Sequence, residues 1–359
     1  MKIIFVQPSI PLYRVHFFKS LAYEFGENLI VIHSKGDLGE LTPSFKSQWS
    51  KCIGRVIKIG FGLNWQKNLI NYPIKRGDIV VVSGNPRYIS SILFILKGKL
   101  LGCKILWWGH YRSSTSKTWR IKLRLALMKL ADGIIFYTEG EVKRYLNLKL
   151  RDYRPIIGLN NGIELIPIKS LRMKYDANYR NQEILFIGRI TEKSNFQFLI
   201  EALQHPKIKN ILLNVIGNEE YNSSITMNKY NFKNGVKINY HGKLTGEKEI
   251  SKIINRCIIF VYPGSVGLSL IHTMAYGLPS LVHSDPLLHM PEIDAFKEGV
   301  TGLTFEPDNL EDFVNKLCWM MSNTKDLNFM SNQCLNRVEN DYNSENMVKK
   351  TITFIKKFT

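Results

Sequence analysis

Two short stretches hold residues that suit the binding of a negatively charged ligand. In "YPGSVGLSL", Gly264, Ser265 and Gly267 follow an apolar run and stand where a helix should begin. Free backbone N–H groups and the positive end of the helix dipole would make this turn an anion site without any charged side chain. In "LFIGRI", Gly188 lets the chain turn, and Arg189 would point a fork of donors at a diphosphate. Arg189 could equally pair with a carboxylate at a domain interface, and glycine-rich turns are common.

Each of these stretches follows a continuous apolar run of the kind that forms a buried parallel strand. The first half contains "KIIFVQ", "NLIVIHS", "DIVVVSG", "KILWWGH" and "GIIFYT", and the second contains "EILFIGR", "ILLNVIGN", "VKINYHG", "CIIFVYPG" and "PSLVHSD". Helical stretches separate these runs, so the sequence predicts an α/β protein with two Rossmann-like domains. In such sheets ligands bind beyond the carboxyl ends of the strands, and a two-domain protein would bind its ligand in the cleft between the domains.

The chain of 359 residues is long enough for two hydrophobic cores. We predict an N-terminal domain over 1–165, a linker over 166–180 and a C-terminal domain over 181–340. The remaining stretch, 341–359, has the pattern of an amphipathic helix that could pack back on the N-terminal domain.

The net charge of +19 is concentrated in the first half of the chain. Residues 1–165 hold 26 Lys and Arg against 10 Asp and Glu, a net of +16, whereas residues 166–359 hold 23 against 20, a net of +3. Nucleic acid and anionic membranes both attract such a surface, and the charge could also be merely solvated. Because no helix-turn-helix, zinc or base-stacking signature appears, we expect no nucleic-acid partner.

A basic amphipathic stretch, "YRSSTSKTWRIKLRLALMKLA", favours a membrane surface as the anionic partner. Its basic residues are Lys117, Arg120, Lys122, Arg124 and Lys129, and they alternate with Trp119, Ile121, Leu123, Leu125 and Leu127. The apolar members could instead pack on the sheet of their own domain. Taken with the charge of the first half, the stretch predicts binding to an anionic membrane surface.

The sequence gives no sign of a metal site, a disulfide framework or a membrane span. The five cysteines form no CxxC pair, and the N-terminal apolar run stops at a proline after one basic residue, which is too short for a signal peptide. No apolar run approaches the roughly 18 residues of a membrane span. We expect a cytoplasmic protein that is soluble or lies on a membrane surface.

Three longer motifs occur in a distinctive order and spacing. They are "LFIGRITEKSNFQFLIEAL", "VYPGSVGLSLIHTMAYGLPS" and "EGVTGLTFEPDNLEDFVNKL", and "ADGIIFYTEGEVKRYL" and "NNGIE" precede them. Together these motifs resemble the GT-B fold glycosyltransferases of the family 4 type, the glycosyl transferases group 1. The resemblance covers nearly the whole chain and is densest from residue 105 onward.

The resemblance implies transfer of a hexose or related sugar from a nucleotide-diphosphate sugar, without a metal or other cofactor and with retention of anomeric configuration. Arg189 would neutralise the leaving diphosphate, and Ser265, Val266, Gly267 and Leu268 would supply backbone amides to it. His110, just after "KILWWG", would lie beside the transferred sugar, although it could also be a helix-capping or interface histidine. We name no general base, because retaining enzymes of this fold generally show none.

Two positions depart from the pattern of the family. Members usually carry two glutamates eight positions apart, one near the donor sugar and one on the ribose, and here those positions are Gly264 and His272. The phosphate-binding lysine five positions after the arginine is replaced by Ser194. Lys193 is adjacent, but one step along a helix turns a side chain by about 100°, which puts its reach in question.

These departures leave more than one interpretation. In an active, divergent enzyme, His272 would donate to the ribose, and Glu292 or Asp285 would handle the sugar hydroxyls. Alternatively, the site has decayed and the protein is a non-catalytic subunit of a polysaccharide assembly complex. A GT-B nucleotide-sugar epimerase would share the fold and the nucleotide site, but it has less use for a basic first half.

The first domain is expected to bind the acceptor. The loop "QPSIPLYRVHFF" after the first strand offers Tyr13, Arg14 and His16, and "SGNPRYIS" offers Asn85 and Arg87. Each of these residues could be merely structural. A lipid-linked or saccharide acceptor in bacterial surface polysaccharide synthesis, of the O-antigen (lipopolysaccharide) or capsule type, fits both the charge and the resemblance. The protein would then be peripheral on the inner face of the cytoplasmic membrane.

Overall fold

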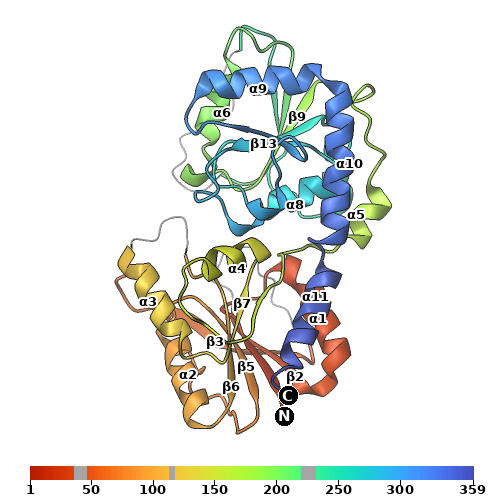
Figure 1. Cartoon of the computed structure of the whole chain (residues 1–359). Coiled ribbons are helices and arrows are strands. Elements are labelled where there is room, and N and C mark those ends of the chain that lie inside the picture. The colour runs from red at the N-terminus through yellow and green to blue at the C-terminus, as the bar shows by residue number, and fades with distance from the viewer. Residues whose placement is uncertain (36–46, 113–117, 220–231) are drawn as a thin grey trace. The chain divides into compact units, whose positions relative to one another are not determined.

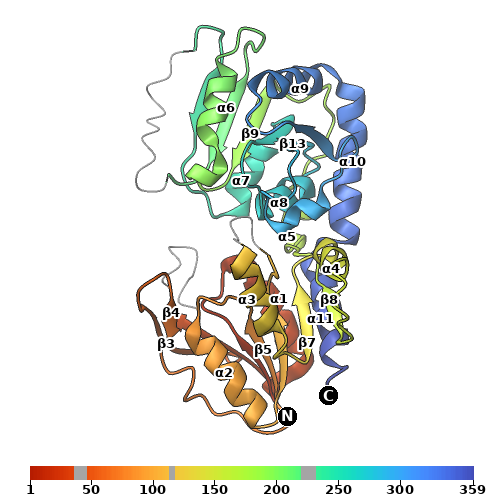
Figure 2. The ribbon, with the colours of Figure 1, turned by 60° about the vertical axis from the view of Figure 1, so that its left-hand side comes forward.

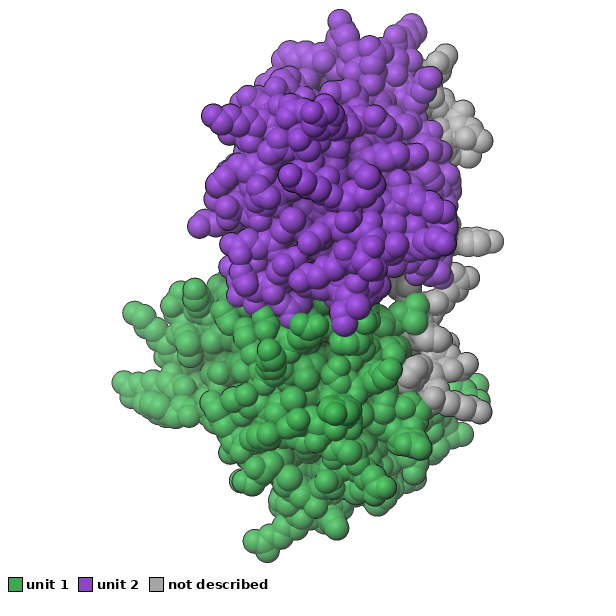
Figure 3. All heavy atoms as spheres, turned by 90° about the vertical axis from the view of Figure 1, so that its right-hand side faces the viewer, with its two compact units in different colours: residues 1–164, 344–359 green, residues 165–343 purple. Residues whose placement is uncertain are grey.

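The chain folds into two compact units, each built around its own parallel sheet. The computed structural model describes residues 1–35, 47–112, 118–219 and 232–359. Unit 1 contains residues 1–164 and 344–359, and unit 2 contains residues 165–343 (Figure 3). The chain therefore passes from one unit to the other twice.

The described part of unit 1 has an eight-stranded sheet in the order β4-β3-β2-β1-β5-β6-β7-β8. All neighbouring strands pair in parallel except β3 and β4, which are antiparallel. The strands are β1 (Ile3–Val6), β2 (Leu29–Lys35), β3 (Ser50–Lys58), β4 (Asn64–Gln66), β5 (Ile79–Ser83), β6 (Lys104–Trp108), β7 (Gly133–Phe136) and β8 (Ile156–Gly158). The helices are α1 (Leu12–Phe25), η1 (Gly26–Asn28), α2 (Ile89–Leu100), α3 (Thr118–Met128), α4 (Glu139–Leu146) and α11 (Ser344–Ile355) (Figure 1).

Both faces of this sheet are buried, as continuous apolar strands require. Successive residues of β1 point to opposite faces, so Ile3 and Phe5 join one hydrophobic cluster and Ile4 and Val6 join another. The first cluster includes residues of α1 and α11, and the second includes residues of α2, α3 and α4 (Figure 2). The helices thus cover both faces of the sheet, so a ligand site can form only at the ends of its strands.

The C-terminal helix packs on unit 1, as its amphipathic pattern predicts. Helix α11 lies beside α1 (Figure 1), and its Met347 and Phe354 are buried in the same cluster as Phe17 and Trp108. The backbone N–H of Ser344 donates to the carbonyl of Ile163 at 2.9 Å. The helix begins at 344 rather than 341, because the preceding helix α10 continues to residue 340.

Unit 2 has a six-stranded, fully parallel sheet in the order β11-β10-β9-β12-β13-β14 over its described residues. The strands are β9 (Glu183–Ile187), β10 (Leu212–Ile216), β11 (Lys237–Tyr240), β12 (Ile259–Tyr262), β13 (Ser280–His283) and β14 (Gly302–Phe305). The helices are α5 (Ile166–Leu171), η2 (Glu192–Ser194), α6 (Phe196–Leu203), α7 (Glu247–Ile254), α8 (Leu268–Ala275), η4 (Pro291–Ala295), α9 (Leu310–Ser322) and α10 (Thr324–Asn340).

The predicted linker over 166–180 is instead an ordered part of unit 2. Its residues include helix α5, and the Arg172 guanidinium donates to the carbonyl of Ala275 and to Glu339, both at 2.9 Å. The buried Tyr175 hydroxyl donates to the carbonyl of Ile258 at 2.7 Å. These side chains fix residues 166–180 to unit 2. The sequence of this segment has no regular apolar pattern, so it did not predict this packing.

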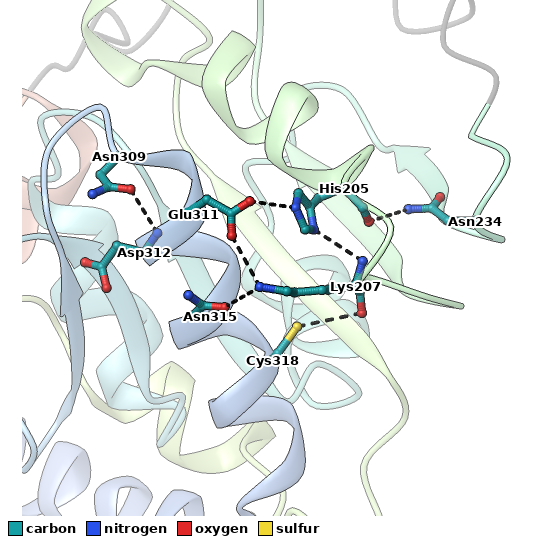
Figure 4. Close-up of polar contacts among 8 residues, drawn as sticks. All are labelled: His205, Lys207, Asn234, Asn309, Glu311, Asp312, Asn315 and Cys318. Carbon is teal, nitrogen blue, oxygen red and sulfur yellow. Dashed lines mark hydrogen bonds and ion pairs between the residues drawn. The ribbon is translucent and has the colours of Figure 1, made fainter.

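A polar network on the surface of unit 2 fastens the α6–β10 connection to α9 (Figure 4). Glu311 contacts Nε2 of His205 at 2.9 Å and Nζ of Lys207 at 3.3 Å, and the same ammonium reaches Asn315 at 3.0 Å. Exposed ion pairs of this kind contribute little stability. In the described part of the chain, no helix is long and apolar enough to cross a bilayer.

Candidate functional site

Two neighbouring parallel strands of unit 2 end beside each other and bring the predicted donor residues together. Strand β9 pairs with β12, so Gly188 and Tyr262 meet at one edge of the sheet. Gly188 has φ +151°, and a Cβ there would lie 3.0 Å from the Tyr262 ring. Burial raises the pKa of Tyr262 to about 12, and the nearby positive charge of Arg189 opposes that rise. Arg189 follows Gly188 directly, and Tyr262 is the last strand residue before the glycine-rich turn, so the two predicted donor segments are neighbours.

The glycine at position 264 is required by a close approach of two backbone segments. A Cβ on Gly264 would lie 2.2 Å from the carbonyl oxygen of Lys193 and 2.4 Å from the carbonyl carbon of Ser194. The backbone N–H of Ser265 also donates to the carbonyl of Lys193 at 2.8 Å. No side chain fits at 264 in this arrangement, so the glutamate of the family pattern has no place there.

Two of the four predicted backbone amides are already used in hydrogen bonds within the protein. The N–H of Ser265 is taken by Lys193, and the N–H of Val266 donates to Nδ1 of His289 at 3.2 Å. The hydrogen bonds among described residues leave the amides of Gly267 and Leu268 without an acceptor. These two amides open helix α8, so the first turn of α8 is the candidate anion site.

The 263–267 loop rests on a pair of buried histidines. The rings of His283 and His289 stack at 3.7 Å, and Nε2 of His289 lies 2.9 Å from the carbonyl oxygen of His283. Nε2 must donate there, so Nδ1 is the acceptor for the Val266 amide. Burial lowers the pKa of His289 to about 4, which keeps the ring neutral. The sequence reasoning missed this support, although "HSDPLLH" places both histidines just after a predicted strand.

Glu292 lies close to the start of α8. It is buried in η4, and its Oε2 would be 3.8 Å from a Cβ on Gly267. Asp285, the alternative acid, accepts a hydrogen bond from the backbone N–H of Leu287 at 2.8 Å within a turn. Of the two predicted acids, Glu292 has the contact with the anion turn.

A carboxylate that the sequence reasoning missed stands beside His272. Nε2 of His272 lies 2.9 Å from Oε1 of Glu247, which also accepts from the Tyr276 hydroxyl at 2.6 Å. Burial raises the pKa of Glu247, but the bonds from His272 and Tyr276 outweigh burial and lower it overall. Glu247 is the first residue of α7, 25 positions away along the chain, so no local spacing revealed the pair.

Ser194, at the position of the family's phosphate-binding lysine, makes structural hydrogen bonds with its hydroxyl. Its buried hydroxyl donates to the carbonyl of Thr191 at 2.7 Å and accepts from the Thr191 N–H at 3.0 Å. The bond from the Thr191 N–H is half of a capping box that begins η2, in which the Ser194 N–H donates to the Thr191 side chain. The backbone carbonyl of Lys193 accepts a hydrogen bond from the Ser265 N–H of the 263–267 loop, and the Lys193 side chain is exposed.

In unit 1, His110 is held by an acid from a helix. Nδ1 of His110 lies 2.8 Å from Oε1 of Glu141, and its ring lies 4.3 Å from the ring of Tyr137. The other oxygen of Glu141 accepts from the backbone N–H of Tyr137 at 3.1 Å. The imidazole is thus oriented just beyond strand β6, at the edge where ligands bind in such sheets.

Two of the predicted acceptor residues line a small cavity at the same edge of the unit 1 sheet. It has a volume of about 190 Å³ and is lined by Gln7, Pro8, Ser9, Pro11, Tyr13, Arg14, Phe18, Ser83, Trp108 and Tyr137. Tyr13 is 44% exposed, whereas Arg14 is buried.

The remaining predicted acceptor residues are placed differently. Nδ1 of His16 lies 3.1 Å from the Ser344 hydroxyl, so His16 helps to fix the start of α11 and does not line the cavity. Asn85 accepts from the backbone N–H of Arg87 at 3.2 Å in a surface turn, and both residues are exposed. His16 and the side-chain carbonyl of Asn85 therefore have structural roles in unit 1.

Comparisons with known proteins agree with this geometry. Residues 168–337 match the family model of the glycosyl transferases group 1. HepE from Anabaena, solved in complex with UDP, has 12% identity and a TM-score of 0.70, with 99% of this chain and 100% of that chain covered. Sucrose-phosphate synthase from Thermosynechococcus elongatus has 14% identity and a TM-score of 0.71, covering 99% and 98%.

The lipopolysaccharide outer core galactosyltransferase WaaB, in its apo form, has 16% identity and a TM-score of 0.68 and covers both chains fully, at 100% each. No curated protein matches the chain. The solved structures share the fold, and the family match falls within unit 2, which holds the anion turn and Arg189. The chain therefore has the GT-B fold, and residues 168–337 of its second unit match the glycosyl transferases group 1 domain.

Proposed function

We propose that the protein transfers a sugar from a nucleotide-diphosphate sugar, with the donor bound by unit 2 and the acceptor bound by unit 1. One observation carries this proposal: the amides of Gly267 and Leu268 open a helix beside the turn that holds Arg189. A leaving diphosphate there would meet a helix N-terminus and a guanidinium. Stabilisation of the leaving group is usually the largest catalytic contribution in such transfers.

The rest of the donor has candidate partners in the same unit. Glu292, next to the first turn of α8, would accept hydrogen bonds from the hydroxyls of the donor sugar. His272, oriented by Glu247, would contact the ribose. Because the chain itself supplies positive charge at the diphosphate, the transfer proceeds without a metal ion. Anomeric configuration is retained, and the leaving phosphate takes the proton of the acceptor.

We further propose that the acceptor is a lipid-linked or saccharide intermediate of bacterial surface polysaccharide synthesis. The similarity in fold to WaaB, a lipopolysaccharide outer core enzyme, supports this assignment. So do the exposed apolar side chains of α3 and of the 146–153 segment, hereafter the α3 face. Its exposed apolar residues are Trp119, Leu123, Leu146, Leu148, Leu150 and Tyr153.

Basic residues line a cavity that also includes Leu150 of this set. This cavity of about 410 Å³ between α3 and the 146–153 segment is lined in part by Lys122, Lys129, Arg151 and Arg154, with Asp152 as its acid. Such a mixture of bases and exposed leucines suits the interface of an anionic membrane. Lys117 of the predicted basic stretch lies outside the described residues. The enzyme would act from the inner face of the cytoplasmic membrane.

The donor site is tested by calorimetric titration with UDP, GDP, dTDP and, as a monophosphate control, CMP. One diphosphate should bind saturably, and Arg189→Ala should weaken it at least tenfold, about 1.4 kcal/mol, the size expected of a charge-assisted contact. Arg256→Ala, which removes an exposed arginine elsewhere in unit 2, is the matched control and should leave the affinity unchanged. Absence of binding by every diphosphate would sink the proposal in favour of a non-catalytic protein.

A further inference from the structure

Arg14 is a buried cation whose hydrogen-bond partners, among the described residues, are neutral groups. Its side chain is only 6% exposed, and its guanidinium donates to Oδ1 of Asn161 and to Sδ of Met347, both neutral groups. Among the residues that the structure describes, no Asp or Glu forms an ion pair with Arg14, and the nearby Glu164 pairs with His16 at 3.7 Å. Buried arginines are usually paired with an anion, because removing a charge from water is unfavourable.

Aromatic rings replace some of the missing counter-charge. The guanidinium carbon lies 5.0 Å from the Trp108 ring centroid and 5.3 Å from that of Tyr13. Ring faces attract a cation, but they carry no net negative charge. Arg14 therefore remains a site of uncompensated positive charge inside unit 1.

This charge borders a cavity, so an anion could reach it. Arg14 lines the cavity of about 190 Å³ together with Ser83, Trp108 and Tyr137. Ser83 and Trp108 are the last residues of β5 and β6, so the cavity lies at the edge of the sheet where ligands bind. Its volume is below the roughly 300–1,000 Å³ of drug-sized sites and suits one small ring. Aromatic walls with a few polar groups are the usual lining of such a site.

We propose that this cavity binds an acidic sugar, a sugar ring carrying a carboxylate or a phosphate, whose charge pairs with Arg14. The inference rests on the proposed function, because it identifies the ligand as part of the glycosyl acceptor. The acceptor would thus carry a negative charge on the sugar residue that occupies this cavity. A guanidinium accepts a carboxylate or a phosphate by the same forked geometry, and the choice between them is left to the probes.

The test uses the full-length protein without nucleotide, at low salt, and ligand-detected NMR titrations. The probes are glucuronate, glucose 6-phosphate, neutral glucose and inorganic phosphate. At least one acidic sugar should bind ten times more tightly than glucose and than phosphate. Equal binding of acidic and neutral sugars would overturn the inference, and so would phosphate that binds as tightly as glucose 6-phosphate, because the ring would then contribute nothing.

Variants separate a ligand role of Arg14 from a purely structural one. Arg14→Met keeps a long side chain on the Trp108 ring and removes the charge, so the preference for the acidic sugar should disappear. Lys19→Met, at an exposed position of the same helix, is the control and should keep the preference. A preference that survives in Arg14→Met contradicts the proposal. Ser83→Leu tests the cavity without touching Arg14 and should lower acidic-sugar affinity at least tenfold, even if Arg14→Met fails to fold.

Failure here can be told apart from failure of the proposed function. Diphosphate binding is measured separately and depends on Arg189 in unit 2, whereas the sugar titration depends on Arg14 in unit 1. Normal diphosphate binding with no preference for acidic sugars would refute only the acidic-acceptor inference. Loss of all diphosphate binding would refute the donor site in unit 2. A sugar bound beside Arg14 could then no longer be called a glycosyl acceptor.

Discussion

At the scale of single residues, His289 holds the 263–267 loop through a hydrogen bond that requires a neutral ring. Nδ1 of His289 accepts from the Val266 amide, and a second proton on the ring would remove this acceptor. The pKa of His289 is lowered from 6.5 to about 4 by burial. The folded state therefore binds fewer protons than the unfolded state between these two pH values.

The stability of the protein should consequently depend on His289 in acid. The contribution of the neutral ring is complete above pH 6.5 and is lost as the pH falls toward 4, by up to about 3 kcal/mol. His289→Gln keeps an acceptor and a donor but cannot titrate. Urea unfolding at pH 7.5 and 4.5 should show a larger loss for the wild type than for the variant. Equal losses would mean that His289 is not neutral in the folded protein.

Sequence reasoning could locate residues whose place depends on the local backbone pattern, and it could not find contacts that depend on distant partners. Gly188 and Arg189 follow β9 directly, and Gly267 directly precedes α8, so their places follow from the local pattern. Glu247 reaches His272 from another helix, and no periodicity encodes that contact. Ser194 looked like a substitute for a ligand, but its hydroxyl was needed to cap a turn.

At the scale of elements, α11 completes the core of unit 1 although it lies at the far end of the chain. Its buried face packs against α1 and the sheet, and Phe354 is only 1% exposed. A Cβ on Gly133, the first residue of β7, would lie 3.2 Å from the Phe354 ring. The amphipathic pattern predicted this packing, whereas the linker prediction failed because a few side-chain contacts, not composition, order residues 166–180.

Removal of the Phe354 ring should therefore destabilise unit 1. Phe354→Ala deletes a buried aromatic side chain and should lower the free energy of unfolding by about 3–5 kcal/mol. Lys349→Ala, on the exposed side of the same helix, should change it by less than about 0.5 kcal/mol. Denaturant unfolding followed by tryptophan fluorescence can measure both, since Trp49 and Trp108 belong to the same cluster. A small effect of Phe354→Ala would show that α11 is dispensable for this core.

At the scale of the whole molecule, the two units differ in net charge, and the difference agrees with the ligands proposed for each. Unit 1 (residues 1–164 and 344–359) holds 30 Lys and Arg against 11 Asp and Glu, a net of +19, whereas unit 2 holds 19 against 19, a net of zero. Unit 2 needs little net charge, because backbone amides and one arginine meet the diphosphate. Unit 1 would face both an anionic acceptor and an anionic membrane, and its excess of bases far exceeds what one cavity uses. The surplus is therefore best explained by a surface-wide attraction, such as a membrane provides.

Membrane binding should then depend on the α3 face and on salt. Co-sedimentation with vesicles of phosphatidylglycerol and phosphatidylcholine should be strong at low salt and weaken as salt rises, because exposed charges are screened. Trp119→Ser combined with Leu123→Ser should reduce binding at every salt concentration, since apolar insertion is lost. Leu100→Ser, at an exposed site on α2, is the matched control. Binding that the double variant leaves intact would place the contact on another face, and no binding at low salt would leave the charge of unit 1 to its soluble ligands.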